Sequence, residues 1–109
     1  MILARQEKGE SLWQRGRREE AVSVWTEALQ RNSQLVLVNN ELAGAARASG
    51  KLDEADLYEK QADQFTPNDP LYHWVLGRRL QDLGMTDLAE KHLQQANQLG
   101  VATEMPGEH

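Results

Sequence analysis

Histidine and carboxylate side chains are the groups in this sequence with the clearest chemical potential. The histidines are His73, His92 and the final residue, His109. His73 and His92 have no acidic or hydroxyl partner at a fixed spacing of the kind that nucleophilic or metal-dependent catalysis uses. We therefore interpret these two as partly exposed side chains on different helices, and we do not expect the chain to be an enzyme.

Carboxylates also recur three or four residues apart in one segment. They are Asp53, Asp56, Glu59 and Asp63. This spacing places them on one face of a helix, where they could hold a cation, although a solvated outer face is the more common meaning of the pattern. Cysteine is absent, which excludes thiolate ligands and a cysteine nucleophile. We expect neither a metal site nor a cofactor.

The composition is that of a charged helical protein with a modest core. Of 109 residues, 39% are hydrophobic and 27% are charged, and the formal net charge is −5. This charge opposes a nucleic-acid partner, because binding to phosphates needs a basic surface. Charged residues follow the short apolar run 1–4 at once, so we expect no signal peptide and no membrane span. If Met1 is the natural start, we expect a cytoplasmic protein.

A period of 34 residues organises the positions of these side chains. It is carried by the turn glycines Gly16, Gly50 and Gly84, by Ala21, Ala55 and Ala89 five residues after them, and by Ala28, Ala62 and Ala96. A fixed period of this size, held by small residues, indicates stacked structural repeats.

Apolar periodicity predicts six helices, over about residues 2–14, 18–31, 35–48, 52–65, 71–82 and 86–99. A glycine suited to the left-handed conformation follows the first, third and fifth of them. Asp69 and Pro70 predict the N-cap and first residue of the fifth helix. Because no connection exceeds about five residues, consecutive helices are expected to lie antiparallel and adjacent.

This pattern resembles the tetratricopeptide repeat, a helix–turn–helix unit of 34 residues. The matches are the Leu76-Gly77 pair, the glycine–alanine spacings above, Trp25 and Leu93 four residues after their alanines, the next alanines, and Pro67. The resemblance covers residues 2–101. It implies an all-α fold, a right-handed α-solenoid of six helices. Repeats 2–35, 36–69 and 70–101 would form one domain, 1–101, before a flexible tail, 102–109.

Two positions depart from the family's pattern. Where the family commonly has tryptophan, the three repeats have Arg5, Asn39 and His73. Glu59 stands where a large apolar side chain is usual. We expect Tyr58 or Phe65 to fill the space that Glu59 leaves, and the second helix of the middle repeat to be the most loosely packed.

In this family the first helix of each pair lines a concave groove. The resemblance implies that the groove residues here are Gln6, Glu10, Trp13, Asn40, Gly44, Arg47, Leu71, Trp74, Arg78 and Gln81. Tryptophan and arginine carry much of the energy at interfaces, so Trp13 and Trp74 would anchor a partner between Arg47 and Arg78. Packing between helices is an equal alternative for both tryptophans, whereas Trp25 is expected in the core.

These observations favour a noncatalytic adaptor whose groove docks a peptide segment or helix of another protein. Family members that hold acidic chaperone tails use lysines, asparagines and an arginine, where this chain has Gln6, Glu10, Glu41, Leu71 and Val75. A partner with apolar side chains and scattered polar groups is therefore expected instead. The alternative is an assembly module whose incompletely capped ends mediate homo-oligomerisation or docking onto another domain of a longer polypeptide.

Overall fold

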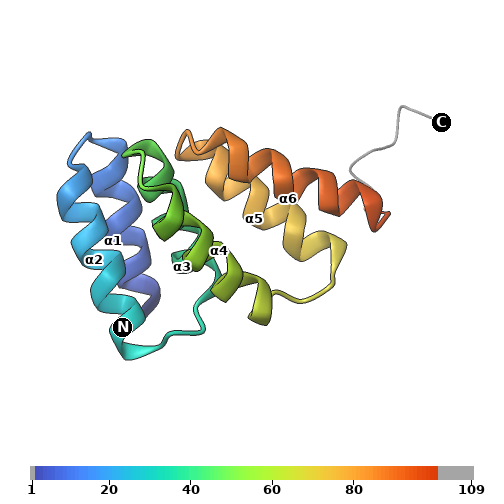
Figure 1. Ribbon diagram of the computed structural model, residues 1–109, viewed down its shortest axis with the longest axis horizontal. Helices are drawn as coiled ribbons and strands as arrows, with labels where there is room; N and C mark the ends of the chain where they lie inside the picture. The colour runs from blue at the N-terminus through green and yellow to red at the C-terminus, as the bar shows by residue number, and fades with distance from the viewer. Residues whose placement is uncertain (1, 101–109) are drawn as a thin grey trace. The chain divides into compact units, whose positions relative to one another are not determined.

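The computed structural model describes the backbone of residues 2–100 and the side chains of residues 8–100. Within this range every regular element is a helix. The helices are α1 (Ile2–Gln14), α2 (Arg18–Arg31), α3 (Val36–Ala48), α4 (Leu52–Phe65), α5 (Pro70–Asp82) and α6 (Thr86–Gln98) (Figure 1). Each pair of consecutive helices joined by a glycine turn packs side by side. The expected all-α fold with adjacent helices is confirmed.

The chain divides into two compact units, with the boundary between Thr66 and Pro67. Unit 1 contains α1 to α4, and unit 2 contains α5 and α6. In unit 1, α2 also packs against α3, so its two helix pairs share a core. The expected tail, 102–109, lies outside the described residues.

The turns form as their residue types predict. Gly16, Gly50 and Gly84 have φ values of 84°, 78° and 77°, a region that side chains with a Cβ rarely adopt. The next N–H bonds back to the helix that is ending, as from Arg17 to the Leu12 carbonyl at 2.9 Å. The Asp69 carboxylate accepts a hydrogen bond from the Leu71 N–H at 3.0 Å, which confirms the predicted N-cap of α5.

Helices α1 and α2 pack closely where Gly9 lies against the indole of Trp25. Trp25 is fully buried, and a Cβ added to Gly9 would lie 2.3 Å from its Nε1 atom. In unit 2, a Cβ on Gly77 would lie 2.8 Å from the Cγ of Leu93. A glycine is therefore needed in the first helix of a pair where the second helix presents a large apolar side chain.

We expect Gly9→Ala to destabilise unit 1 by about 2 kcal/mol, because the added methyl group overpacks a rigid indole. The better helix propensity of alanine offsets only part of this cost. Urea unfolding followed by circular dichroism measures the change. In a Trp25→Leu background the same substitution should stabilise, because the obstacle is gone. A stabilising Gly9→Ala in the native chain would contradict the contact.

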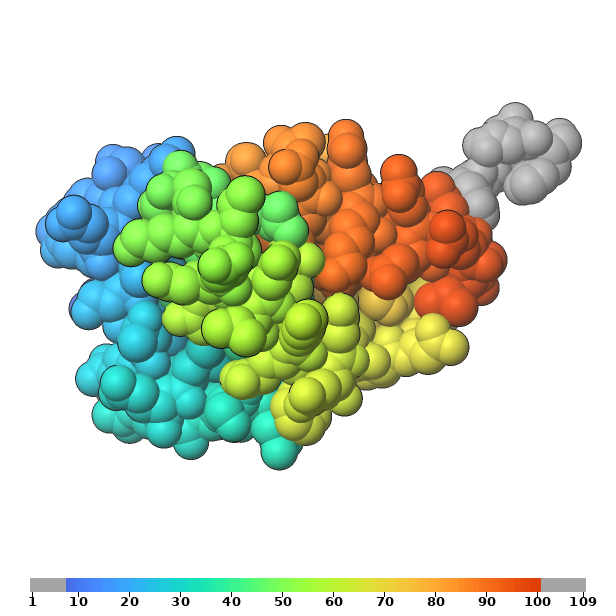
Figure 2. All heavy atoms as spheres, viewed as in Figure 1, coloured from blue at the N-terminus to red at the C-terminus, as the bar shows by residue number. Residues whose placement is uncertain are grey.

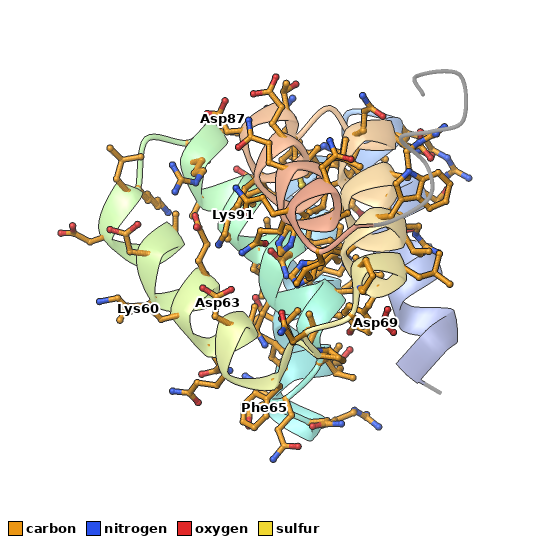
Figure 3. All side chains as sticks on the ribbon, turned by 90° about the vertical axis from the view of Figure 1, so that its right-hand side faces the viewer. Lys60, Asp63, Phe65, Asp69, Asp87 and Lys91 are labelled. Carbon is orange, nitrogen blue, oxygen red and sulfur yellow. The ribbon has the colours of Figure 1, made fainter. Side chains whose placement is uncertain are left out.

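The outer face of α4 is charged. On α2, which packs against α3, Val22, Thr26 and Leu29 are half-buried, whereas the residues 34 positions later on α4 are Asp56, Lys60 and Asp63, all exposed. Figure 2 shows α4 on the surface of unit 1, and Figure 3 shows Lys60 and Asp63 on that helix. Leu52, Leu57 and Phe65 are also exposed on α4, so its surface mixes charged and apolar side chains. The expectation of a solvated face is confirmed for Asp53, Asp56 and Asp63.

Candidate functional site

Trp13 belongs to the core of unit 1. Its side chain is only 7% exposed, and its ring centroid lies 5.8 Å from that of Trp25. The Arg18 guanidinium covers the ring at 4.5 Å from the centroid. The packing alternative therefore holds for this tryptophan, which is not available to anchor a partner. The physical reason is that the short turn between α1 and α2 brings Trp13 back onto Trp25.

The predicted groove residues of α1 and α3 offer few accessible polar groups. Asn40 and Gly44 are both buried, and the Asn40 amide donates a hydrogen bond to the Val36 carbonyl at 2.9 Å. Glu10 is half-buried. Gln6 belongs to α1, but its side chain lies outside the described residues.

Arg47 is occupied by α4. Its Nε atom donates to a carboxylate oxygen of Glu59 at 2.8 Å, its Nη2 contacts the same oxygen, and Asp56 lies 3.9 Å away. This ion pair replaces the apolar contact expected where Glu59 stands. Phe65, one of the two residues expected to fill that space, is exposed, and Tyr58 is half-buried. Arg47 therefore joins α3 to α4 instead of extending toward a partner.

In unit 2, the predicted groove residues are accessible. Leu71 is 57% exposed, Arg78 and Gln81 are exposed, and Trp74 is half-buried. Val75, which is 46% exposed, lies between them on the same side of α5. We call the surface made by Leu71, Trp74, Val75 and Arg78 the α5 face. Its spacing of three, four and seven residues forms one stripe along a helix. That spacing could have identified Val75 from the sequence.

The α5 face combines apolar area with a fixed positive charge. The Arg78 guanidinium lies 5.4 Å from the centroid of the Trp74 ring, a cation–π arrangement that orients it. A guanidinium stacked in this way keeps N–H donors at its edge for a carboxylate or carbonyl. The face can therefore take an apolar side chain beside an acceptor group.

The histidine interpretation is wrong for both helical histidines, because they form a buried pair in unit 2. His73 is 6% exposed and His92 fully buried, with the Nδ1 atoms 3.0 Å apart and the ring centroids 5.3 Å apart in a stacked geometry. One Nδ1 must donate a proton and the other accept it. The pair therefore joins α5 to α6, an arrangement that no spacing in the sequence indicated.

Burial lowers the pKa of His92 from 6.5 to about 4, because the charged imidazolium loses its hydration. The positive charges of Lys91 and His73 lower this pKa further, and a hydrogen bond with Gln95 opposes them. Burial also raises the pKa of the Tyr72 phenol. Among the described residues, no group of three or more His, Cys, Asp or Glu side chains is placed to hold a metal ion.

Asn39 holds the connection between α2 and α3. This residue also occupies a position where the family commonly has tryptophan, and it is fully buried. Its amide donates to the Ser33 and Leu35 carbonyls at 3.1 and 2.9 Å, and Gln61 donates to the Ser33 carbonyl at 2.7 Å. The departures at Asn39 and His73 thus both place hydrogen-bonded polar groups inside their units.

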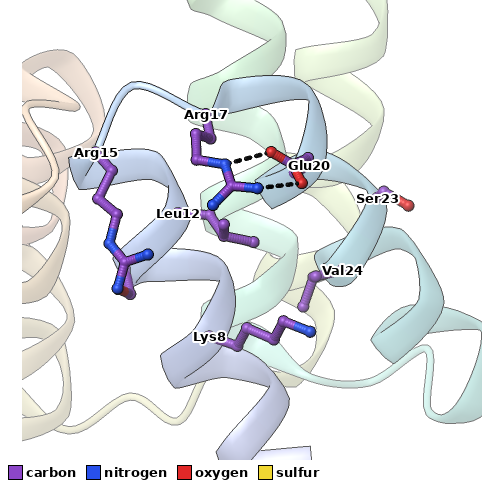
Figure 4. Close-up of a pocket in the computed structure, with 8 residues that line it drawn as sticks. Lys8, Leu12, Arg15, Arg17, Glu20, Ser23 and Val24 are labelled. Atoms are coloured by element: carbon purple, nitrogen blue, oxygen red, sulfur yellow. Dashed lines mark hydrogen bonds and ion pairs between the residues drawn. The ribbon is translucent and has the colours of Figure 1, made fainter.

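A hollow of about 520 Å³ lies between α1 and α2 (Figure 4). It is lined by Lys8, Ser11, Leu12, Arg15, Arg17, Glu20, Ser23 and Val24, and we call it the end groove. Leu12 and Val24 lie between Lys8 and the paired Arg17 and Glu20 in Figure 4. The Arg17 guanidinium donates to both Glu20 oxygens, at 2.5 and 2.8 Å. The sequence analysis singled out none of these residues as a binding site.

Comparisons with known proteins leave the family open, since no family model and no curated protein matches the chain. No helix in the described part of the chain has both the length and the apolar character needed to cross a membrane. Because no family model and no curated protein matches, the function is inferred below from the geometry of each unit.

Proposed function

We propose that this chain is a noncatalytic protein-interaction module, built of tetratricopeptide-like repeats, that docks a segment of another protein on its α5 face. The observation that carries the proposal is the exposure of Leu71 and Val75 one helical turn apart, beside Trp74. Large apolar side chains gathered on one exposed face mark interaction sites, whereas single ones are ordinary. On α4, by contrast, Leu52 and Leu57 are exposed but lie five residues apart, so they do not share a face.

The fitting partner is an extended or helical segment with an apolar side chain and a nearby carboxylate. Leu71 and Val75 would cover the apolar group, Trp74 would supply most of the contact area, and Arg78 would hold the carboxylate. Because a flexible segment must be ordered on binding, we expect a dissociation constant in the micromolar range, on the order of 1–100 μM. A right-handed solenoid arrangement of the repeats remains part of this proposal.

The test is selection of binding peptides from a random phage-displayed library, followed by titration of each peptide against defined variants. We expect Trp74→Ala to weaken the selected peptides by roughly tenfold or more, as truncation of an interface anchor does. The control is Leu57→Ala, which removes an exposed apolar side chain from α4, outside the α5 face. Circular dichroism checks that both variants remain folded.

Two outcomes would contradict the proposal. If Trp74→Ala and Leu57→Ala weaken the selected peptides equally, the α5 face is not the docking site. If light scattering shows a dimer that Val75→Asp abolishes, a second copy of the chain occupies the face. The alternative function, an assembly module, would then replace the adaptor.

A further inference from the structure

Two α1 residues of the end groove, Lys8 and Ser11, correspond in the 34-residue register to buried positions on α3, the helix against which α2 packs. The residues 34 positions after Lys8 and Ser11 are Leu42 and Ala45, which are buried in unit 1, where α2 packs against α3. On α1, by contrast, Lys8 is exposed and Ser11 is half-buried. The repeat register therefore predicts that a helix lying along α1 would rest on the end groove, as α2 rests on α3.

The charges around the end groove define the chemistry of such a helix. Lys8 and Arg15 are seven residues apart, so both lie on one side of α1, and both are exposed. In the part of the chain that the structure describes, neither side chain forms an ion pair, whereas Arg17 is neutralised by Glu20. Two cations that form no ion pair with another described side chain thus flank the apolar side chains of Leu12 and Val24.

We propose that the end groove is a second docking site, which binds an acidic amphipathic helix of another protein. Two carboxylates seven residues apart on that helix would pair with Lys8 and Arg15. A small apolar side chain between them would pack on Leu12 and Val24. The site is distinct from the α5 face and does not depend on the function proposed for that face.

A second copy of the chain is a poorer occupant. Its acidic helix would be α4, whose outer face has Lys60 between Asp56 and Asp63. In unit 1, α1 and α4 belong to different helix pairs, which are joined through the packing of α2 on α3. Docking α4 of one copy on α1 of the next would use two different surfaces and leave both ends open, which produces a growing chain of copies.

The test uses two helical peptides of about 14 residues, alanine-based and with one central leucine. One peptide carries two glutamates seven residues apart, and its twin carries lysines at the same positions. Binding is measured by anisotropy of a labelled peptide at low salt, and amide chemical shifts locate the site. We expect the glutamate peptide to bind roughly tenfold or more tightly than its twin, with shifts at Ser11 and Ser23, and we expect added salt to weaken it.

Charge reversal makes the test specific. We expect Lys8→Glu/Arg15→Glu to abolish binding of the glutamate peptide and to favour the lysine twin instead. The matched control is Arg31→Glu/Lys51→Glu, which makes the same change in charge at exposed cations outside the groove. Similar affinity for both peptides, or an equal loss in the control, would overturn the proposal. So would concentration-dependent self-association that only the groove variant removes.

Discussion

Replacing Trp25 with alanine is expected to lower the free energy of unfolding of unit 1 by about 3–5 kcal/mol. Trp25 is fully buried, with Gly9 against its indole and Trp13 beside it. Its Nε1 atom has no hydrogen-bond partner among the described residues, so its contribution comes from packing. A loss of this size is a large part of the roughly 5–15 kcal/mol that typically stabilises a domain.

Urea unfolding followed by circular dichroism measures this loss, and amide signals of Ala43 assign it to unit 1. Trp74→Ala is the matched control, because it removes the same side chain from a half-exposed position in unit 2. We expect the control to cost about 1 kcal/mol or less, in line with surface substitutions. If the two variants lose the same free energy of unfolding, the packing around Trp25 is not a main source of the stability of unit 1.

Acidification is expected to destabilise unit 2 by up to about 3 kcal/mol between pH 7 and pH 4. The pKa of His92 is about 4 in the folded protein, below its ordinary value of 6.5. Between these values the unfolded chain binds more protons than the folded chain, so lowering the pH favours unfolding. The part of the free energy of unfolding that depends on neutral His92 is fully present above about pH 7 and is lost as the pH falls toward 4.

The geometry of the histidine pair explains why it resists a second proton. The Nδ1 atoms of His73 and His92 face each other at 3.0 Å, so one proton between them makes a hydrogen bond. Protonating the accepting Nδ1 removes the acceptor, sets two N–H groups against each other and places a positive charge in a buried site, which the nearby charge of Lys91 also disfavours. The hydrogen bond between the two imidazoles, which joins α5 to α6, is then lost.

Urea unfolding at pH 7, 5.5 and 4.5, followed at the amide signals of Leu76 and Leu80, measures the effect in unit 2. His92→Leu is the comparison, because it removes the buried titrating group and leaves the carboxylates unchanged. We expect its stability to depend less steeply on pH over this range. Identical pH dependence of the two proteins would refute the role of the pair.

The helices and turns could be predicted because they depend on local residue types. Glycine at a positive φ, an Asp69 N-cap before Pro70, and alanines at a regular spacing need no tertiary information to be interpreted. All six helices were expected within one residue of their observed ends. Leu71, Arg78 and Gln81, which the family resemblance assigned to the groove, are exposed on α5, whereas Val75 was not among the predicted groove residues.

The packing partners of polar and aromatic side chains could not be predicted in the same way. Trp13 faces Trp25, Arg47 holds Glu59, and the two helical histidines meet each other. Each of these contacts joins two helices, and its distance depends on how the helices cross. Composition and periodicity do not contain that information.

For this protein the sequence by itself determined which segments are helical, where they turn and which positions repeat, because backbone sterics and helical periodicity act over a few residues. Only the tertiary structure decided which side chains remain available for binding. A tryptophan or an arginine has the same local preference whether its partner is solvent, a neighbouring helix or another protein. Its exposure depends on contacts between segments that lie far apart along the chain.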